Sequence, residues 1–274
     1  MLKISGREIA QKIIDRLKSE PKPKEILAAV LVGENPTSIS FLKQKEKTAK
    51  ELGVDFRIYR FSQDLKNDDL RDEVGRIANQ KPVGGIIVQL PLPENINSHY
   101  VLNTIPREKD VDVIGERALG AFYTGRNPIS PPSVGVVEEI LKSYTLNLKS
   151  FNVAIVGLGF LIGKPITTWL MGRCSEIYLL DEGSDLSILK QADLVISGVG
   201  KAGLIKPEIL KENAGIIDFG CSVGEDGKVR GDFNALNLKP YTLNLNFYTP
   251  TPAGTGPILV AKVFENFYTL TQKE

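Results

Sequence analysis

The sequence predicts an α/β protein of two domains, and three observations support that prediction. At 274 residues the chain is longer than a single core usually requires. In its first half, short apolar runs alternate with segments of helical period, in the βαβαβ order that produces parallel strands. The second half repeats this theme around a glycine-rich turn at residues 152–165, which read NVAIVGLGFLIGKP.

The first half reads as a regular succession of helices and strands. Apolar residues at helical spacing predict a first helix over 6–19, which the prolines at 21 and 23 stop. Pro36 lies near the first turn of the next predicted helix, and Gly53 suits its C-cap. The expected elements after the first helix are a strand at 26–32, a helix from Pro36 to about Leu52, a strand at 54–61, a helix over 65–79 and a strand at 84–90.

The second half begins after a segment of little periodicity, residues 109–132, which we interpret as active-site loop and linker. A helix is expected over 133–144, before the glycine-rich turn. Further short buried strands are expected in the runs EIYLL, DLVIS and GIIDF. The apolar spacing of residues 258–270 predicts an amphipathic helix that returns to the first domain.

Composition favours small-molecule chemistry in the cytoplasm. Lys plus Arg number 34 and Asp plus Glu number 33, so the chain has no broad basic field for nucleic acid. It shows no secretory signal and no apolar run long enough to span a bilayer. Cys174 and Cys221 have no metal or redox spacing, which favours free buried thiols. Because His99 is the single histidine, we expect neither a zinc site nor a Ser-His-Asp triad.

The glycine-rich turn is a candidate dinucleotide site. Gly157, Gly159 and Gly163 lie between a predicted strand and a predicted helix, where backbone N–H groups and the helix dipole can hold a pyrophosphate. Their spacing, G-x-G-x-x-x-G, is one residue longer than the usual fingerprint. An ordinary tight turn between a strand and a helix remains the alternative.

Three residues of the predicted second helix share one face: Ser38, Phe41 and Lys45, at i, i+3 and i+7. The alternative is that Phe41 belongs to the core and that Lys45 is one more solvated lysine. Periodicity does not separate the two.

Two further groups lie after predicted strands. Gln89 ends a strand within the run QLPLP, and ligands bind at the carboxyl ends of strands in open α/β sheets. A polar residue at a strand edge is its alternative interpretation. Asp110 and Asp112 belong to the tetrapeptide KDVD, which from composition alone is also typical of a solvated loop.

Together these motifs resemble the methylenetetrahydrofolate dehydrogenase/cyclohydrolase family of one-carbon metabolism. The resemblance covers nearly the whole chain and rests on VGENPTSISFLKQKEK, VQLPLP, KDVD, IVGLGFLIGKP, GIIDFG, GD at 231–232 and TPTPAGTGP. It implies a folate-binding catalytic domain of three α/β layers at 1–130, completed by the helix at 255–274, and a Rossmann-type dinucleotide-binding domain with a parallel sheet at 131–254. The folate cleft of the family lies between these domains.

The resemblance also implies residue roles and partners. Lys45 matches the catalytic lysine of the family, Gln89 its positioning glutamine and Asp112 its pterin-binding carboxylate. The implied substrate-binding residues are Ser38, Phe41, Pro91 and Pro257, and the implied cofactor-binding residues are Gly157, Leu158, Gly159, Gly163, Asp181 and Cys221. The implied partners are a tetrahydrofolate substrate, NAD or NADP without a metal, and a second copy of the chain in a homodimer formed through the nucleotide domain.

Four positions depart from the family pattern. Phe41 replaces the usual tyrosine, which keeps a stacking face and loses a hydroxyl, so cyclohydrolase turnover is the activity that this change affects most. Val113 replaces the glycine that follows KDVD, and residues 130–133 read SPPS in place of a PCTP-type segment, so a reshaped loop along the cleft is an open alternative. Leu259 replaces the threonine that commonly follows Pro257.

The cofactor turn favours NAD over NADP, although the family more often uses NADP. Leu158 occupies the position of the arginine in the GRS triplet of NADP-preferring members, and Asp181-Glu182 replaces their His-Ser pair. An acidic residue about twenty positions after the glycines can bind a ribose 2′-hydroxyl and repel a 2′-phosphate. An N-cap or turn role for Asp181 is the alternative.

Three rival functions stay open on the sequence alone. A different two-domain NAD-linked dehydrogenase could contain the glycine turn, but it has no reason to combine Lys45, QLPLP and KDVD. A dehydrogenase with weak or absent cyclohydrolase activity, or a dinucleotide or folate binder without catalysis, is compatible with Phe41, Val113 and Ser133, whereas the retained Lys45 and Gln89 argue against the loss of catalysis.

Overall fold

The computed structural model describes residues 2–224, 226–233 and 245–272. The chain divides into two units, and each is described here by itself. The three-stranded unit comprises Lys12–Pro132 and Val260–Glu274, and the six-stranded unit comprises Met1–Gln11 and Ser133–Leu259. Positions 273 and 274 of the helix expected over 255–274 lie outside the described residues, as do positions 225 and 234–244 of the expected nucleotide domain.

The three-stranded unit alternates strands and helices. Its strands are β2 (Ile26–Val32), β3 (Asp55–Phe61) and β4 (Val83–Val88). Its helices are α2 (Pro36–Leu52), α3 (Asn67–Ala78), α4 (Ser98–Leu102) and α5 (Glu116–Tyr123), with a 3₁₀ turn η1 at Arg107–Lys109 and parts of α1 (Gly6–Lys18) and α8 (Thr255–Thr271).

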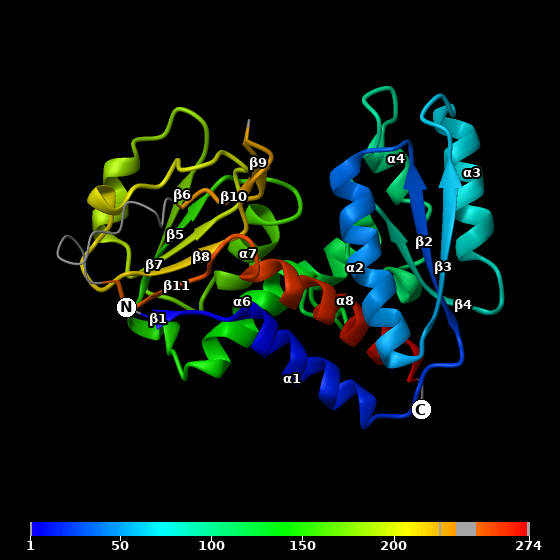
Figure 1. Cartoon of the computed structure of the whole chain (residues 1–274), viewed down its shortest axis with the longest axis horizontal. Coiled ribbons are helices and arrows are strands. Elements are labelled where there is room, and N and C mark those ends of the chain that lie inside the picture. The colour runs from blue at the N-terminus through cyan, green and yellow to red at the C-terminus, as the bar shows by residue number, and fades with distance from the viewer. Residues whose placement is uncertain (1, 225, 234–244, 273–274) are drawn as a thin grey trace. The chain divides into compact units, whose positions relative to one another are not determined.

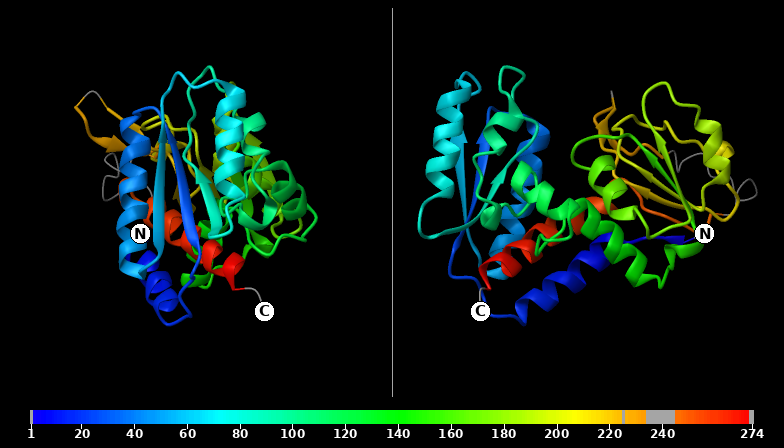
Figure 2. Two further views of the ribbon diagram at one scale, coloured as in Figure 1. Left: turned by 90° about the vertical axis from the view of Figure 1, so that its right-hand side faces the viewer. Right: turned by 180° about the vertical axis from the view of Figure 1, so that it is seen from behind.

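The sheet of this unit has the order β3-β2-β4, and both pairings are parallel. Every residue of the central strand β2 is buried. Because right-handed crossovers run from β2 to β3 and then back past β2 to β4, α2 and α3 cover opposite faces of the sheet (Figures 1 and 2). The parallel three-layer arrangement predicted from the sequence is therefore confirmed.

Helix α8 completes the core of the three-stranded unit. The side chains of Phe264 and Phe267 are fully buried, and the ring of Phe264 lies 6.5 Å from that of Phe56 on β3. A Cβ atom at Gly85 on β4 would come within 2.7 Å of the Phe267 ring, so glycine permits this close approach. The predicted return of the C-terminal helix to the first domain is confirmed.

The six-stranded unit carries one parallel sheet of order β1-β11-β8-β7-β5-β6 and a two-stranded antiparallel pair, β9 with β10. The strands are β1 (Leu2–Lys3), β5 (Asn152–Val156), β6 (Glu176–Leu180), β7 (Leu194–Ser197), β8 (Gly215–Asp218), β9 (Ser222–Val223), β10 (Val229–Arg230) and β11 (Phe247–Tyr248). The helices are α6 (Pro132–Ser143) and α7 (Gly163–Leu170), with 3₁₀ turns η2 (Leu148–Ser150), η3 (Leu186–Gln191) and η4 (Pro207–Ile209).

The expected loop at 109–132 needs correction, because residues 116–123 form α5. This helix has eight residues, and Ala118 is its one buried residue, so no repeating apolar stripe marks it in the sequence. Strands β1 and β11 were also not predicted. Each has two residues, and each exists because it pairs with a chain segment far away in the sequence.

Candidate functional site

Helix α2 directs its functional face toward the end of β4. The side chain of Asn35 caps the helix by accepting from the Ser38 N–H at 3.0 Å, and Gly53 ends it in the left-handed conformation with φ of 69°. The buried Ser38 hydroxyl donates to the carbonyl of Leu90 at 3.4 Å. The half-buried Lys45 Nζ donates to Gln89 Oε1 at 3.0 Å. The interpretation of Lys45 as a solvated lysine is therefore wrong.

Gln89 is fixed by three hydrogen bonds at the end of β4. Its backbone N–H continues the sheet by donating to Val30 O at 2.9 Å. Its side-chain amide donates to Leu90 O at 2.8 Å, and this leaves Oε1 to accept from Lys45. The next peptide bond, Leu90–Pro91, is cis, and Pro91 is exposed. Gln89 therefore acts as an oriented acceptor for the amine.

Asp112 and Lys45 interact electrostatically, and burial removes both charged groups from water. Burial lowers the pKa of the Lys45 ammonium below its ordinary value, and the charge of Asp112 opposes that shift. Burial likewise raises the pKa of the Asp112 carboxyl, and Lys45 opposes it. The structure thus brings Ser38, Lys45, Gln89 and Asp112 into one neighbourhood. A lysine in this setting reaches its neutral form more easily than an exposed one.

Asp110 organises the loop that carries Asp112. It is 1% exposed, and its Oδ2 accepts from the N–H groups of Ile114 at 2.9 Å and Gly115 at 2.8 Å. Burial raises its pKa to about 7, with the charge of Asp112 adding to the rise and the backbone donors opposing it. The alternative of a solvated KDVD loop is wrong for Asp110.

The backbone conformation at Val113 explains why a glycine suits the position after KDVD. Its φ is 55°, in the left-handed region that a β-branched residue rarely adopts, and its side chain is 1% exposed. The chain therefore keeps a glycine-type backbone at Val113 despite the substitution. The following SPPS segment is also anchored, since the Asn266 amide donates to Ser130 O at 2.9 Å.

The glycine-rich turn of the six-stranded unit is shaped by contacts that exclude side chains. Gly157 has φ of 88° and follows β5 directly. A Cβ at Gly163, the first residue of α7, would come within 2.0 Å of Gly157 O, whereas a Cβ at Gly159 would meet nothing within 4 Å. The turn therefore needs glycine at 157 and 163 for its own packing, and it is open at 159. This is the form of a cradle that lets a phosphate approach the backbone, so these residues fit a dinucleotide.

The second serine of the SPPS segment, Ser133, supports this turn. Ser133 is 2% exposed, and its hydroxyl donates to Leu161 O at 2.7 Å. Leu158, at the position of the family arginine, is half-buried within the turn, and Leu161 is 44% exposed. Ser133 therefore ties the start of α6 to the glycine-rich turn.

Asp181 and Cys221 follow β6 and β8. Asp181 begins a turn in which its N–H donates to Ser184 Oγ at 2.9 Å, and its own side chain is exposed. It is a turn residue and not an N-cap; the cap of the following 3₁₀ turn is Asp185. Both cysteines are free, as expected, but Cys221 is exposed and Cys174 is intermediate. The expectation that both thiols are buried is therefore wrong for Cys221, and Cys174 is only half-buried.

Two carboxylates received no role from the sequence, although the motifs GIIDFG and GD contain them. Asp218 ends β8, and Asp232 follows β10; they are 1% and 0% exposed. Burial raises the pKa of Asp218 to about 6, and the charge of Asp232 adds to the rise. Asp218 belongs to the run GIIDF, which the sequence predicts as a buried strand, whereas no local pattern indicates the burial of Asp232.

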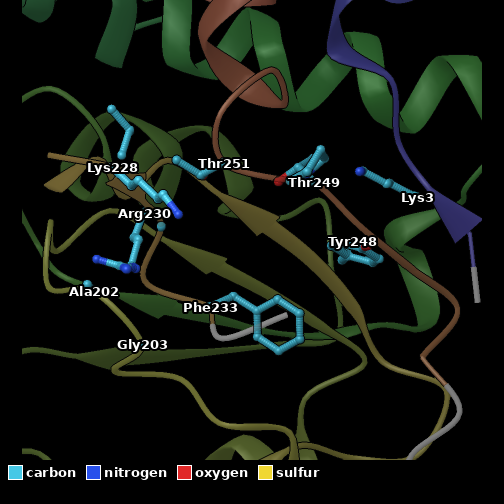
Figure 3. Close-up of a pocket in the computed structure, with 12 residues that line it drawn as sticks. Lys3, Ala202, Gly203, Lys228, Arg230, Phe233, Tyr248, Thr249 and Thr251 are labelled. Carbon is cyan, nitrogen blue, oxygen red and sulfur yellow. The ribbon is translucent and has the colours of Figure 1, made fainter. Parts of the chain in front are cut away.

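A separate pocket of about 580 Å³ lies in the six-stranded unit beside Asp232. Its wall includes Lys3, Arg230, Phe233 and Tyr248 (Figure 3). Within residues 2–224, 226–233 and 245–272, no group of three or more His, Cys, Asp and Glu side chains is arranged to hold a metal ion. The same residues contain no helix with the length and apolar character needed to cross a membrane.

Comparison with known proteins decides the family. Residues 4–112 match the catalytic domain of tetrahydrofolate dehydrogenase/cyclohydrolase, and residues 131–274 match the NAD(P)-binding domain of the same family. The chain belongs to the tetrahydrofolate dehydrogenase/cyclohydrolase family. The Lys45 neighbourhood lies in the catalytic-domain match, and the glycine-rich turn lies in the NAD(P)-binding match.

Individual relatives cover nearly the same length. The bifunctional protein FolD of a Hydrogenobaculum species is 32% identical over 270 residues, which is 96% of each chain. FolD of Staphylococcus carnosus is 32% identical over 242 residues, which is 88% of this chain and 84% of the relative. The crystal structure of the bifunctional FolD methylenetetrahydrofolate dehydrogenase/cyclohydrolase of Campylobacter jejuni has a TM-score of 0.91 at 28% identity, over 98% of this chain and 97% of that one.

Proposed function

We propose that the protein oxidises 5,10-methylenetetrahydrofolate to the 5,10-methenyl form with NAD or NADP, and that it hydrolyses the methenyl form to 10-formyltetrahydrofolate in one-carbon metabolism. The observation that supports this most is the 3.0 Å hydrogen bond between Lys45 and Gln89, within the residues that match the family's catalytic domain. Two relatives named as bifunctional FolD, which align over 88% and 96% of this chain, support both activities.

In the oxidation, the protein contributes chiefly by positioning. A bound nicotinamide dinucleotide supplies the hydride acceptor. We assign Ser38, Phe41 and Pro91 to folate binding, with the Phe41 ring as a stacking surface, and the backbone of Gly157 to Gly163 to the pyrophosphate. Holding donor and acceptor carbons at near contact distance provides much of the rate acceleration of such a transfer.

In the hydrolysis, Lys45 is the proposed proton acceptor. Water adds through its oxygen to the methenyl carbon and gives one proton to the neutral Lys45 amine. The bond from that carbon to N5 then breaks while the remaining hydroxyl proton passes to N5, which leaves the formyl C=O on N10. The Lys45 ammonium then releases its proton to water. Burial and the cationic substrate both disfavour the charged amine and lower its pKa, so the neutral form that accepts a proton is easier to reach than in an exposed lysine. Gln89 holds the amine in place, and Asp112 is the proposed partner of the pterin ring.

The Lys45→Met variant tests this assignment. We expect folate oxidation to be measurable and methenyl hydrolysis to be abolished, with an unchanged circular dichroism spectrum. Lys43→Met is the matched control, because Lys43 is an exposed lysine of the same helix. Hydrolysis at the wild-type rate in Lys45→Met would refute the role of this amine.

Phe41 favours a second candidate, a dehydrogenase with weak cyclohydrolase activity. The ring is half-buried on the same helix as Lys45, and it lacks the hydroxyl with which a tyrosine could bond to substrate or lysine. The Phe41→Tyr variant separates the candidates. If the missing hydroxyl limits hydrolysis, the variant hydrolyses the methenyl form faster than the wild type, and if it does not, the two rates agree.

For the choice of dinucleotide, we propose NAD. Asp181 follows β6 with an exposed carboxylate, which suits a ribose 2′-hydroxyl and opposes a 2′-phosphate. Leu158 offers no positive charge. Solved proteins of this fold include one from Trypanosoma brucei in complex with NADP, at 24% identity and a TM-score of 0.90, and an NAD-dependent enzyme from Saccharomyces cerevisiae, at 17% and 0.81. The fold therefore accommodates both, and local residues must decide.

We further propose a cytoplasmic homodimer formed through the nucleotide domain, with domain limits near residues 130 and 254. The family resemblance supports the dimer. Light scattering coupled to gel filtration tests it: a homodimer has twice the 30.1 kDa mass of the chain. Elution as a 30 kDa species at micromolar concentration would contradict this proposal.

A further inference from the structure

Asp232 accepts hydrogen bonds from three donors on or next to one loop. Its Oδ2 accepts from the Ser197 hydroxyl at 2.6 Å and the Val199 N–H at 2.8 Å. Its Oδ1 accepts from the Lys201 N–H at 2.7 Å. The carboxylate is 0% exposed. Both oxygens are therefore used to hold the loop that follows β7.

That loop lies against the glycine-rich turn. A Cβ at Gly157 would come within 2.9 Å of Val199 Cγ2 and 3.2 Å of the Gly198 carbonyl group. A Cβ at Gly198 would come within 2.6 Å of Ile162 Cγ2, just before α7. The loop at 198–201 and the turn at 157–163 are thus packed together at the carboxyl ends of β7 and β5.

The sheet order makes this place the expected dinucleotide crevice. β5 and β7 are neighbours; the chain leaves β5 toward β6 on one side and leaves β7 toward β8 on the other, so the two connections run in opposite directions. In open parallel sheets, ligands bind outside the carboxyl ends of the strands at such a switch point. One wall of the crevice is the glycine-rich turn, and the other is the loop that Asp232 holds.

Asp232 is itself firmly placed. The adjoining Phe233 N–H donates to Asp218 Oδ2 at 2.9 Å, and the Phe233 ring packs edge-on against Tyr248 at 5.9 Å, as the pocket view shows (Figure 3). The backbone carbonyl of Asp232 also accepts from the Ile205 N–H at 2.8 Å. A Cβ at Gly220 would come within 2.2 Å of Asp232 Oδ1, so glycine at 220 leaves room for the carboxylate.

We propose that Asp232 is a positioning residue for the dinucleotide: it fixes the backbone of the 198–201 loop in the shape that binds the cofactor. The proposal rests on the NAD(P)-dependent function proposed above. Asp232 acts through the loop and does not itself need to touch the ligand. Because the Val199 and Lys201 N–H groups both donate to Asp232, the loop has a fixed shape, and a fixed wall lowers the cost of ordering the loop on binding.

The two acceptor oxygens of Asp232 matter as well as its size. A carboxylate can accept from donors on both oxygens, whereas an asparagine of the same size has one acceptor and one NH₂ donor. In Asp232→Asn, the NH₂ group must face either the Lys201 N–H or the Val199 N–H together with the Ser197 hydroxyl. One side of the loop therefore loses its partner, and a donor meets a donor.

Direct binding of NAD and of NADP to the purified full-length protein, measured by calorimetry without folate, tests the proposal. We expect Asp232→Asn to weaken binding of the preferred dinucleotide at least tenfold. In steady-state oxidation, KM for the dinucleotide rises by the same factor, and KM for the folate changes less than twofold. A merely structural role for Asp232 predicts no such separation between the two substrates.

Ser197→Ala is the matched control. It removes one buried hydrogen bond to the same carboxylate but leaves both loop N–H groups bonded, so it loses thermal stability and keeps dinucleotide affinity within threefold of the wild type. If Asp232→Asn is folded and binds within twofold of the wild type, or if both variants lose affinity equally, the proposal is overturned. Because binding is measured without turnover, absence of folate oxidation in the wild type would count against the proposed function and not against this role.

Amide hydrogen exchange in the wild-type protein provides a second test, which does not depend on the folding of a variant. In the absence of dinucleotide, the Val199 and Lys201 amides should exchange at least 100-fold more slowly than unstructured amides. Exchange of both amides at the unstructured rate would show that Asp232 does not hold the loop, and this too would overturn the proposal.

Discussion

The three-stranded and six-stranded units both place their candidate sites at the carboxyl ends of parallel strands, but they build them from different atoms. In the three-stranded unit, the site consists of side chains: the Lys45 amine donates to the Gln89 amide oxygen, and both lie near the Asp112 carboxyl. In the six-stranded unit, the glycine-rich turn is main chain, and contacts at Gly157 and Gly163 exclude any Cβ.

This difference determines how each site responds to substitution. Exchange of a reactive side chain can remove chemistry and leave the fold, because the rest of α2 is held by its caps and its buried face. Exchange of a glycine in a backbone site changes the fold of the site itself. The predictions below test this contrast, in order of decreasing expected effect.

The largest effect is expected in the side-chain site. Lys45→Met should reduce methenyl hydrolysis at least about 100-fold, since general acid–base groups typically contribute factors of that size or more. Its melting temperature should stay close to that of Lys43→Met. The decay of the methenyl absorbance measures the rate. A large loss of stability in Lys45→Met with retained hydrolysis would contradict the claim that this side chain serves the chemistry and not the fold.

In the backbone site, Gly163→Ala and Gly159→Ala form a matched pair. The added Cβ at 163 would lie 2.0 Å from Gly157 O, so we expect a loss of about 3 kcal/mol in the free energy of unfolding, as for severe overpacking. At 159 nothing lies within 4 Å, so stability is retained and dinucleotide affinity falls. Urea titration and calorimetry measure these two quantities. Equal stability of both variants would contradict the account of this turn.

The side chains around the backbone site should tune the choice of cofactor. Asp181→Ala should shift the ratio of kcat/KM for NADP to that for NAD about tenfold toward NADP, because it removes a charge that repels the 2′-phosphate. Glu182→Ala, at the exposed neighbouring position, is the control. An unchanged ratio in Asp181→Ala, or a wild-type protein that clearly prefers NADP, would remove the basis for assigning NAD.

Taken per pH unit, the smallest effect is expected in the pH dependence of stability. The pKa of Asp110, about 7 in the folded protein, lies above the ordinary value, so between about pH 4 and 7 the folded protein keeps a proton that the unfolded chain has lost. The stability due to this proton is fully present below that range and is lost as pH rises through 7, by at most about 1.4 kcal/mol per pH unit.

Asp110→Asn removes this titration and can still accept from Ile114 and Gly115. Urea denaturation from pH 5 to 8 should therefore give a flatter stability profile in the variant than in the wild type. Asp64→Asn, at an exposed site, is the control and should follow the wild-type curve. Parallel profiles for Asp110→Asn and the wild type would contradict the buried, protonated state of Asp110.

The elements that were predicted accurately have strong local signals. The predicted strand at 26–32 matches β2, and Asn35, Pro36 and Gly53 delimit α2 through capping geometry that operates within a few residues. Strands β1 and β11 could not be predicted in the same way, because two residues become a strand only when a distant segment pairs with them. Helix α5 is too short to show a period.

The candidate site shows the same division between features that local sequence signals predict and features that depend on tertiary contacts. The helical spacing of Ser38 and Lys45 correctly predicts one face, but their bonds to Leu90 and Gln89 depend on the position of β4, which is a tertiary property. The burial of Asp110 and Asp232 also follows from tertiary packing, and no local pattern indicates it. Resemblance to the family's motifs supplied the proposed roles of Ser38 and Lys45, and it gave Asp232 none.

One assay tests the central claim most directly: 5,10-methylenetetrahydrofolate and the purified protein are mixed in one cuvette with NAD or with NADP, and the methenyl absorbance is followed over time. The account predicts that absorbance rises with the dinucleotide, faster with NAD, and that purified methenyltetrahydrofolate decays faster with the wild type than with Lys45→Met. Absence of any dinucleotide-dependent rise with either cofactor would contradict it.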